Sequence, residues 1–259
     1  MRYAAIGDSF SEGVGDELPD GSVRGWTDLV AAGLSAGLAD RGEKLEYANL
    51  AIRGRLLRPI VTTQLDAALA LRPAADLITF NGGGNDTMRP GVDLADLVTL
   101  IEQAIQRCAD AGVRLVVLSG ADPTARLPFG QTVRRRVVYL TAATAEVCAR
   151  HNVTLVNAFD DEEIRDPRYW SDDRLHLNSI GHRRVADLVL HALGFGELPG
   201  PAAPGAEGRR RVADNLRYYG EYVLPWIQRR LRGRSSGDDR NPKYAQWELI
   251  EPTAQSPLT

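Results

Sequence analysis

The chain is poor in cysteine and in long apolar runs, and it carries little net charge. Two cysteines in 259 residues, Cys108 and Cys148, make neither a disulfide framework nor a zinc site. No apolar run approaches the roughly 20 residues that cross a bilayer, so we expect no stable membrane insertion. The formal charge of −3 gives no global attraction to nucleic acid, which we do not expect as a partner. No signal peptide precedes the first apolar run, so we expect a cytoplasmic protein.

Short apolar runs alternate with amphipathic stretches over the first 195 residues. The runs at 3–6, 45–50, 76–80, 113–118 and 153–156 are typical of buried strands. Helical spacing predicts helices at 25–41, 58–71, 94–108, 131–150 and 180–193. Strands that alternate with helices indicate a parallel sheet covered on both faces. The sequence therefore predicts an α/β fold, a three-layer α/β/α arrangement around a doubly wound parallel sheet of about five strands.

A change of composition after residue 198 predicts a second, smaller part of the chain. Residues 199–208, PGPAAPGAEG, have the composition of a linker. Beyond it, Val212, Leu216, Tyr219 and Val223 share one helical face. We predict a main domain over residues 1–198 and, over residues 209–259, a C-terminal extension made of an amphipathic helical segment and a mostly irregular tail. Its apolar face should pack on the main domain or on a second copy, which leaves a homo-oligomer open.

Three residues with the chemistry of nucleophilic catalysis fall at predicted strand ends or shortly before a helix. Ser9 follows the first strand in the turn Gly7-Asp8-Ser9, and Asp173 and His176 stand before the last helix. Ligands of doubly wound sheets bind beyond the carboxyl ends of the strands, so one rim should hold all three. A serine hydroxyl needs an adjacent base, which a histidine oriented by a carboxylate supplies. Ser11 is a competing serine, but it lies farther from the strand end.

Two more strand ends carry groups that can stabilise an oxyanion. Gly54, in NLAIRG, offers a backbone N–H, and Asn85, in GGGND, offers a side-chain amide. Ser9 adds its own backbone N–H. The glycine run could instead cradle a phosphate, but the lysine of a P-loop does not follow it.

The other three of the four histidines have simpler interpretations. His151 stands at a predicted helix end and His191 within a helix, and both are expected to be structural. His182 falls in the first turn of the last helix, where we expect it to bond within the loop–helix junction. A metal site built from Asp173, His176 and His182 lacks a recognised ligand spacing. We therefore expect neither a metal nor an organic cofactor.

Taken together and in this order, these motifs resemble the blocks of the SGNH hydrolases, the GDSL lipase/esterase superfamily. GDS at 7–9, NLAIRG at 49–54, GGND at 83–86 and the pair Asp173 and His176 carry the resemblance, which covers residues 1–195. It implies a flavodoxin-like sheet. It also implies Ser9 as nucleophile, with Ser9, Gly54 and Asn85 as oxyanion donors. The ending RRLRGRSSGD is similar to those of actinobacterial members.

The resulting hypothesis is a serine esterase that hydrolyses carboxylic esters of small molecules or carbohydrates, with short acyl or acetyl groups. An acyltransferase with the same acyl-enzyme chemistry is one alternative, and a non-catalytic binding module is another. Specificity should come from the loops at 121–130 and 160–172, where Phe129 and Trp170 are candidate substrate-binding residues.

Overall fold

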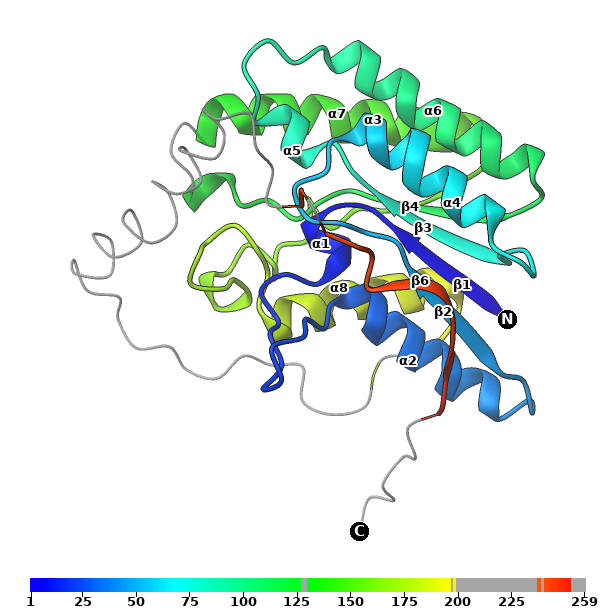
Figure 1. The fold of residues 1–259 in the computed structure, drawn as a ribbon. Helices are drawn as coiled ribbons and strands as arrows, with labels where there is room; N and C mark the ends of the chain where they lie inside the picture. Colours follow the sequence, from blue (N-terminus) through cyan, green and yellow to red (C-terminus); the bar gives the residue numbers. More distant parts are fainter. Residues whose placement is uncertain (127–129, 197, 199–236, 239, 253–259) are drawn as a thin grey trace.

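The fold is built on one sheet, seen in the computed structural model (Figure 1), which describes residues 1–126, 130–196, 198, 237, 238 and 240–252. The strands lie in the order β5-β4-β3-β1-β2-β6. Their bounds are β1 Arg2–Ile6, β2 Leu45–Asn49, β3 Leu77–Asn81, β4 Arg114–Leu118, β5 Thr154–Val156 and β6 Tyr244–Ile250. The first five strands pair in parallel, and β6 runs antiparallel to β2. The predicted α/β fold is confirmed, and an antiparallel edge strand is added to the parallel sheet.

Helices cover both faces of this sheet (Figure 1). On one face lie α2 (Trp26–Ala39) and α8 (Ser179–Leu193); on the other lie α4 (Leu65–Ala70), α6 (Leu94–Asp110) and α7 (Gly130–Arg150). Three short helices, α1 (Ser9–Glu12), α3 (Leu57–Pro59) and α5 (Gly84–Thr87), follow the carboxyl ends of β1, β2 and β3. The single helix predicted at 58–71 is divided, because a π-helical turn, Ile60–Gln64, separates α3 from α4. Two 3-10 turns lie at Thr124–Arg126 and Pro167–Tyr169.

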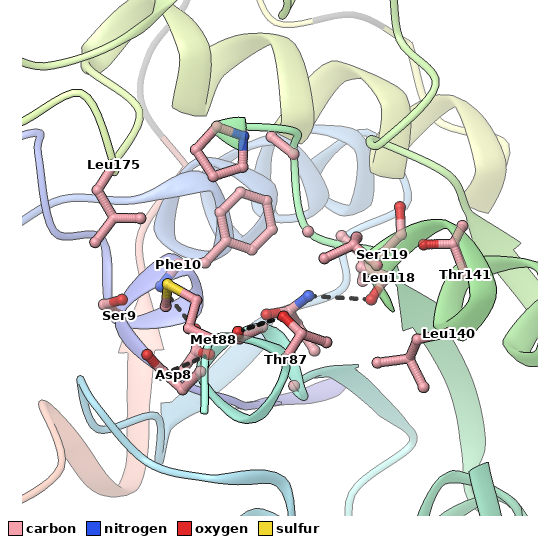
Figure 2. A pocket seen from close by; sticks show the side chains of 18 of the residues that line it. Asp8, Ser9, Phe10, Thr87, Met88, Leu118, Ser119, Leu140, Thr141 and Leu175 are labelled. Carbon is pink, nitrogen blue, oxygen red and sulfur yellow. Dashed lines mark hydrogen bonds between the residues drawn. The ribbon is translucent and has the colours of Figure 1, made fainter. Parts of the chain in front are cut away.

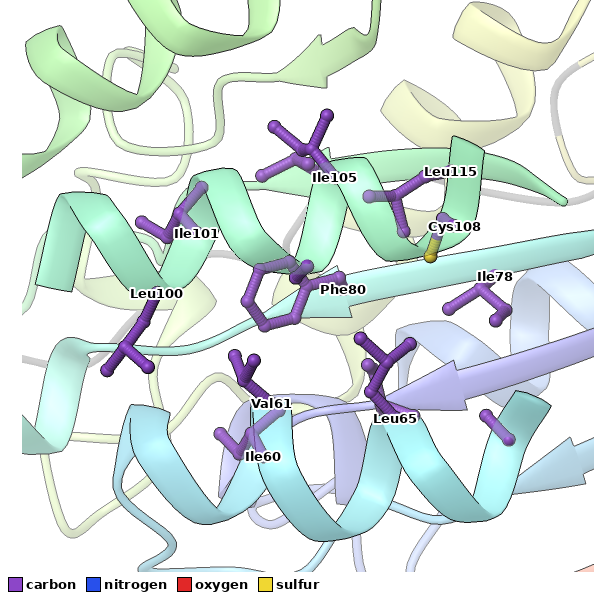
Figure 3. Packing of buried hydrophobic residues seen from close by; sticks show 14 of the residues in the cluster. Ile60, Val61, Leu65, Ile78, Phe80, Leu100, Ile101, Ile105, Cys108 and Leu115 are labelled. Carbon is purple, nitrogen blue, oxygen red and sulfur yellow. The ribbon is translucent and has the colours of Figure 1, made fainter. Parts of the chain in front are cut away.

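The sheet divides the apolar core into two clusters. Along β1, Ala4 and Ile6 belong to the cluster under α4 and α6, whereas Tyr3 and Ala5 belong to the cluster under α2 and α8. In the first cluster, Phe80 of β3 lies between Val61 and the helix α6 (Figure 3). Successive strand residues thus enter different clusters, which explains why these strands appear in the sequence as unbroken apolar runs.

The helix that the apolar spacing predicted at residues 94–108 is confirmed as α6. Asp93 caps its first turn, where the carboxylate accepts the N–H groups of Ala95 at 3.0 Å and Asp96 at 3.1 Å. Its inner face ends at Cys108, which is buried, as is Cys148 on α7; both are free thiols. Burial raises the pKa of each thiol to about 11, which leaves them protonated and unreactive at neutral pH.

The C-terminal end departs from the sequence prediction. Instead of lying within an irregular tail, residues Tyr244–Ile250 form β6 at the open edge of β2. Lys243 Nζ lies 2.7 Å from Asp28 Oδ2, and Trp247 Nε1 donates to the carbonyl of Pro73 at 2.9 Å. The strand was missed because most of its side chains are exposed, so it carries no apolar run; the edge of β2 provides its backbone partners. The predicted linker at 199–208 and amphipathic helix at 209–223 lie outside the described residues.

The strand order brings Ser9 and Asn85 to one edge of the sheet. β1 lies between β2 and β3, so the chain leaves β1 on one side and returns on the other. That reversal is the topological switch point, where doubly wound folds bind their ligands. Helix α1 begins just beyond β1 and α5 just beyond β3, so Ser9 and Asn85 both lie at this point.

Candidate active site

Ser9 is the first residue of α1, and two residues, Gly7 and Asp8, separate it from the end of β1. Asp8 caps the helix, and its Oδ1 accepts the N–H of Phe10 at 3.1 Å. Gly7 is held by the side chain of Gln64, which accepts its N–H at 2.7 Å and donates to its carbonyl at 2.9 Å. A Cβ on Gly7 would lie 2.5 Å from Ser11 Oγ, so the turn that presents Ser9 requires glycine there. The nucleophile candidate is therefore held on a turn with little freedom to shift.

His176 lies against Ser9, although 167 residues separate them in the sequence. Its Nε2 is 2.9 Å from Ser9 Oγ, and its Nδ1 is 2.5 Å from Asp173 Oδ2. The other oxygen of Asp173 accepts the backbone N–H groups of Leu175 and His176, each at 2.9 Å. The structure thus places the three predicted side chains in a continuous hydrogen-bonded row.

The carboxyl group of Asp173 has a strongly perturbed acidity. Burial acts to raise its pKa, but the hydrogen bond and the positive charge of His176 act in the opposite direction and hold the pKa well below its usual range. A hydrogen bond from Ser171 Oγ, at 2.7 Å, acts in the same direction as His176. Asp173 is therefore ionised at neutral pH and favours the tautomer of His176 with its proton on Nδ1. In that tautomer Nε2 accepts a hydrogen bond from Ser9.

Asn85 extends from α5 toward the turn that bears Ser9. Its Nδ2 donates to Asp8 Oδ2 at 3.1 Å and to the carbonyl of Arg55 at 3.0 Å. Burial raises the pKa of Asp8 to about 6, although the N–H of Phe10 and the charge of His176 lower it. Asp8 thus connects the start of α1 to the amide of Asn85, and Asn85 in turn contacts the loop after β2.

Gly54 lies in that loop, with its backbone in the left-handed region at a φ of 74°. The preceding residue, Arg53, donates its backbone N–H to Glu12 Oε2 at 2.5 Å and its guanidinium to Glu12 Oε1 at 2.6 and 2.8 Å. Glu12 is buried and is the last residue of α1. From the C-terminal segment, Gly237 approaches so closely that a Cβ there would lie 2.0 Å from the carbonyl oxygen of Arg53. The loop of Gly54 is therefore fixed both to the helix of Ser9 and to the C-terminal segment.

A cavity of about 130 Å³ opens beside Ser9 and His176 (Figure 2). Trp170, a candidate substrate-binding residue, is part of its lining; its indole N–H donates to the carbonyl of Ile164 at 2.6 Å, and the guanidinium of Arg126 lies 4.7 Å from the ring centre. Asn85 is also in the lining, whereas Gly54 is not. Phe129 lies outside the described residues.

The two residues considered as alternatives, Ser11 and His182, are buried away from this cavity. Ser11 is fully buried, and its hydroxyl has no hydrogen-bond partner within the described part of the chain. His182 accepts the N–H of Trp26 on Nδ1 at 3.2 Å and faces the carbonyl of Val14 with Nε2 at 3.1 Å. Burial lowers the pKa of His182 to about 4, so it is neutral and structural. Among the described residues, no group of three or more His, Cys, Asp or Glu side chains could hold a metal ion.

Sequence reasoning missed three residues that shape the site: Asp8, Glu12 and Gln64. Asp8 was identified only as part of a motif, and its contact with Asn85 depends on tertiary structure. Glu12 and Arg53 are opposite charges at neighbouring strand ends, which was a usable signal for an ion pair. Gln64 gave no signal, because nothing in the sequence shows that a helix residue bonds to the backbone of Gly7.

The family comparison agrees with the motifs. Residues 5–184 match the model of the GDSL-like lipase/acylhydrolase family, which is most of the chain. The chain therefore belongs to this family, and it is a hydrolase that acts on ester bonds. A search of curated protein sequences found no match.

Solved structures of enzymes share the fold. The crystal structure of TesA is 24% identical, with a TM-score of 0.59 over 74% of this chain and 98% of that one. A catalytic mutant of Axe2, an acetylxylan esterase from Geobacillus stearothermophilus, is 16% identical, with a TM-score of 0.60 over 77% and 97%. The esterase EstA from Pseudoalteromonas sp. is 17% identical, with a TM-score of 0.57 over 74% and 96%. In the described part of this chain, no helix is long and apolar enough to cross a membrane.

Proposed function

We propose that the protein is a serine esterase in which Ser9, His176 and Asp173 form a catalytic triad. The observation that carries the proposal is the unbroken row from Ser9 Oγ to His176 Nε2, at 2.9 Å, and from His176 Nδ1 to Asp173 Oδ2, at 2.5 Å. These are the contacts that a serine needs in order to lose its proton as it attacks. The row lies at the mouth of an apolar cavity that can receive part of a substrate.

The reaction follows from these positions. Ser9 Oγ attacks the carbonyl carbon of the ester, and its proton passes to His176 Nε2. The tetrahedral intermediate then collapses, and His176 gives that proton to the departing alcohol. Water, deprotonated by His176, attacks the acyl group on Ser9, and collapse of the second intermediate releases the acid and restores the hydroxyl. The ionised Asp173 stabilises the imidazolium that forms in each half of the reaction.

The developing oxyanion needs donors, and we assign this role to Ser9, Gly54 and Asn85. The N–H of Ser9 belongs to the first turn of α1 and so has no partner within that helix. Gly54 is one residue from Arg55, whose carbonyl accepts the amide of Asn85. Asn85 Nδ2 donates to Asp8 and to the carbonyl of Arg55. To donate to the substrate, it must therefore give up one of these hydrogen bonds or share that hydrogen between two acceptors. Catalytic hydrogen bonds commonly reach their final geometry only with substrate bound.

The substrate is proposed to be an ester of a small molecule or carbohydrate with a short acyl group. Trp170 is an aromatic residue of the lining that we propose contacts the substrate. Water is proposed as the acceptor of the acyl group; an added alcohol that captured most of it would favour acyl transfer instead. A cytoplasmic location and a homo-oligomer through the C-terminal segment stay predictions from the sequence.

Hydrolysis of p-nitrophenyl esters by Ser9→Ala and Ser11→Ala variants tests the proposal. Ser9→Ala should abolish turnover while leaving the circular dichroism spectrum and melting temperature close to those of the wild type. Ser11→Ala is a matched control two residues away, and because its buried hydroxyl has no partner among the described residues, its removal should leave turnover intact. A folded Ser9→Ala protein that kept near-wild-type turnover would refute the triad. Loss of turnover in Ser11→Ala alone would move the nucleophile to Ser11.

A further inference from the structure

One face of α7 forms a long wall of the cavity beside Ser9. The lining residues of this helix recur at helical spacing, namely Val133, Val137, Leu140, Thr141 and Thr144. Facing them are Phe80 of β3, Val117 of β4 and Ile101 of α6, all buried core residues. The cavity therefore reaches from the catalytic row to the apolar layer between α7 and the sheet.

Two polar side chains of the lining, Asn81 and Thr87, are already bonded within the protein. Asn81 Nδ2 donates to the carbonyl of Leu118 at 3.0 Å, and Thr87 Oγ1 donates to that of Gly84 at 2.8 Å. Among the described lining residues, only Asp8 and His176 are ionisable, and both lie at the end where Ser9 stands. A sugar placed deep in the cavity would lose water from its hydroxyls and find few partners in return, which is unfavourable. A hydrocarbon chain has no hydrogen bonds to water to lose, and its burial is favoured by the hydrophobic effect.

The direction of the cavity indicates which half of an ester it holds. In Figure 2, Ser9 and Leu175, the neighbour of His176, lie on one side of the view, and Leu140 and Thr141 lie on the other. His176 must reach the leaving oxygen in order to protonate it, so the alcohol lies on the side of His176. The acyl chain then points the other way, along α7.

We propose that this cavity is an acyl-chain pocket, and that it selects esters of linear saturated acids of about six carbons. Its volume of about 130 Å³ is close to that of an engineered apolar cavity of about 150 Å³ that binds benzene, a six-carbon molecule. An acetyl group leaves most of this space empty, and a chain much longer than six carbons exceeds the volume of the cavity. The inference rests on the proposed function, since it needs Ser9 to carry the acyl group.

The first test is the acyl-length dependence of kcat/KM on p-nitrophenyl acetate, butanoate, hexanoate, octanoate and dodecanoate. Each buried methylene is worth about fourfold, so hexanoate should exceed acetate by roughly two-hundredfold. No further gain should follow at octanoate, and dodecanoate should be slower. The isomers ethyl hexanoate and hexyl acetate separate the two halves of the ester, because both have the same atoms; ethyl hexanoate should be hydrolysed at least about tenfold faster.

The second test shortens the pocket. Thr141→Phe should reduce activity on hexanoate by at least about tenfold and move the optimum to acetate or butanoate, while acetate itself is still hydrolysed. Ala142→Phe adds the same ring at the adjacent, exposed position of α7 and should leave the ranking unchanged. Should Thr141→Phe fail to fold, as shown by its circular dichroism spectrum and loss of acetate hydrolysis, Thr141→Leu should give the same shift to a smaller degree.

Three results would overturn the pocket assignment. They are acetate as the best substrate of the wild type, a rate that keeps rising to dodecanoate, and faster hydrolysis of hexyl acetate than of ethyl hexanoate. Ser9→Ala keeps this test separate from that of the proposed function. If Ser9→Ala is inactive on every ester and the wild type prefers acetate, only the assignment of the pocket is wrong. If Ser9→Ala stays active, the proposed triad is wrong.

Discussion

The stability difference between Asp8→Asn and the wild type should move in favour of the variant as pH rises. Asp8 is buried, and its burial raises the pKa from 3.8 to about 6. Between these values the folded protein binds a proton that the unfolded chain has released, so wild-type stability falls as pH rises through this window. The shift corresponds to about 3 kcal/mol once the pH is well above 6. An asparagine has no proton to lose, and its oxygen can still accept the N–H of Phe10, so the variant escapes this pH-dependent penalty. It loses the second oxygen, which accepts the amide of Asn85, but that loss is the same at every pH and does not change the slope.

The assay is urea unfolding of both proteins at intervals from pH 4 to pH 8. The difference in unfolding free energy between variant and wild type should move in favour of the variant, with most of the change of about 3 kcal/mol falling inside this range. His182 titrates in both proteins, so its contribution cancels in the difference. Asp40→Asn, at an exposed helix end, is the control and should change stability by less than about 0.5 kcal/mol at every pH. A difference for Asp8→Asn that is constant with pH, or that favours the wild type as pH rises, would refute the reasoning.

Three further predictions concern single elements. Asn85→Ala should lower kcat about a hundredfold or more with a smaller effect on KM, because an oxyanion donor acts on the transition state; a change in KM alone would make Asn85 a ground-state contact. The folded state keeps His182 neutral, with a pKa of about 4, so the Asp8→Asn variant, which lacks the opposite contribution of Asp8, should lose about 3 kcal/mol of stability as pH falls from about 6.5 to 4; unfolding curves of that variant that do not shift over this range would contradict it. Deleting residues 237–259 removes β6 from β2 and should lower the melting temperature at every protein concentration, by roughly 2–4 °C for each kcal/mol of stability lost; a change that depends on concentration would point to a second copy.

The sequence predicted the sheet because its strands are covered on both faces. Val113–Leu118 and similar runs are apolar almost without interruption, and such runs can be recognised without knowing what covers them. β6 could not be recognised in this way, since Tyr244 and Leu249 are among its exposed side chains and its stability comes from the edge of β2. The π-helical turn at Ile60–Gln64 could not be predicted either, because the apolar spacing of the sequence does not change there.

The candidate site was predictable where the chemistry follows directly from residue types at strand ends. Ser9, Asp173 and His176 are such residues, and the structure places them in contact. The contacts of Asn85 were not predictable, because they depend on how Asp8 and Arg55 turn toward it from two other strand ends. The fixing of the Gly54 loop by Glu12 and Gly237 joins three distant parts of the chain, which no local pattern records.

Labelling with a fluorophosphonate, followed by mass spectrometry of the digested protein, tests the central claim most directly. The serine hydroxyl displaces fluoride from the reagent and forms a stable phosphonyl adduct, which requires a base that activates the hydroxyl. We predict one adduct, on Ser9 in the peptide that contains GDSFSEG, with loss of esterase activity in proportion to labelling. His176→Ala should abolish the adduct, because Ser9 then lacks its base. An adduct on Ser11 or on any other serine, or full activity in protein labelled to completion on Ser9, would contradict the account.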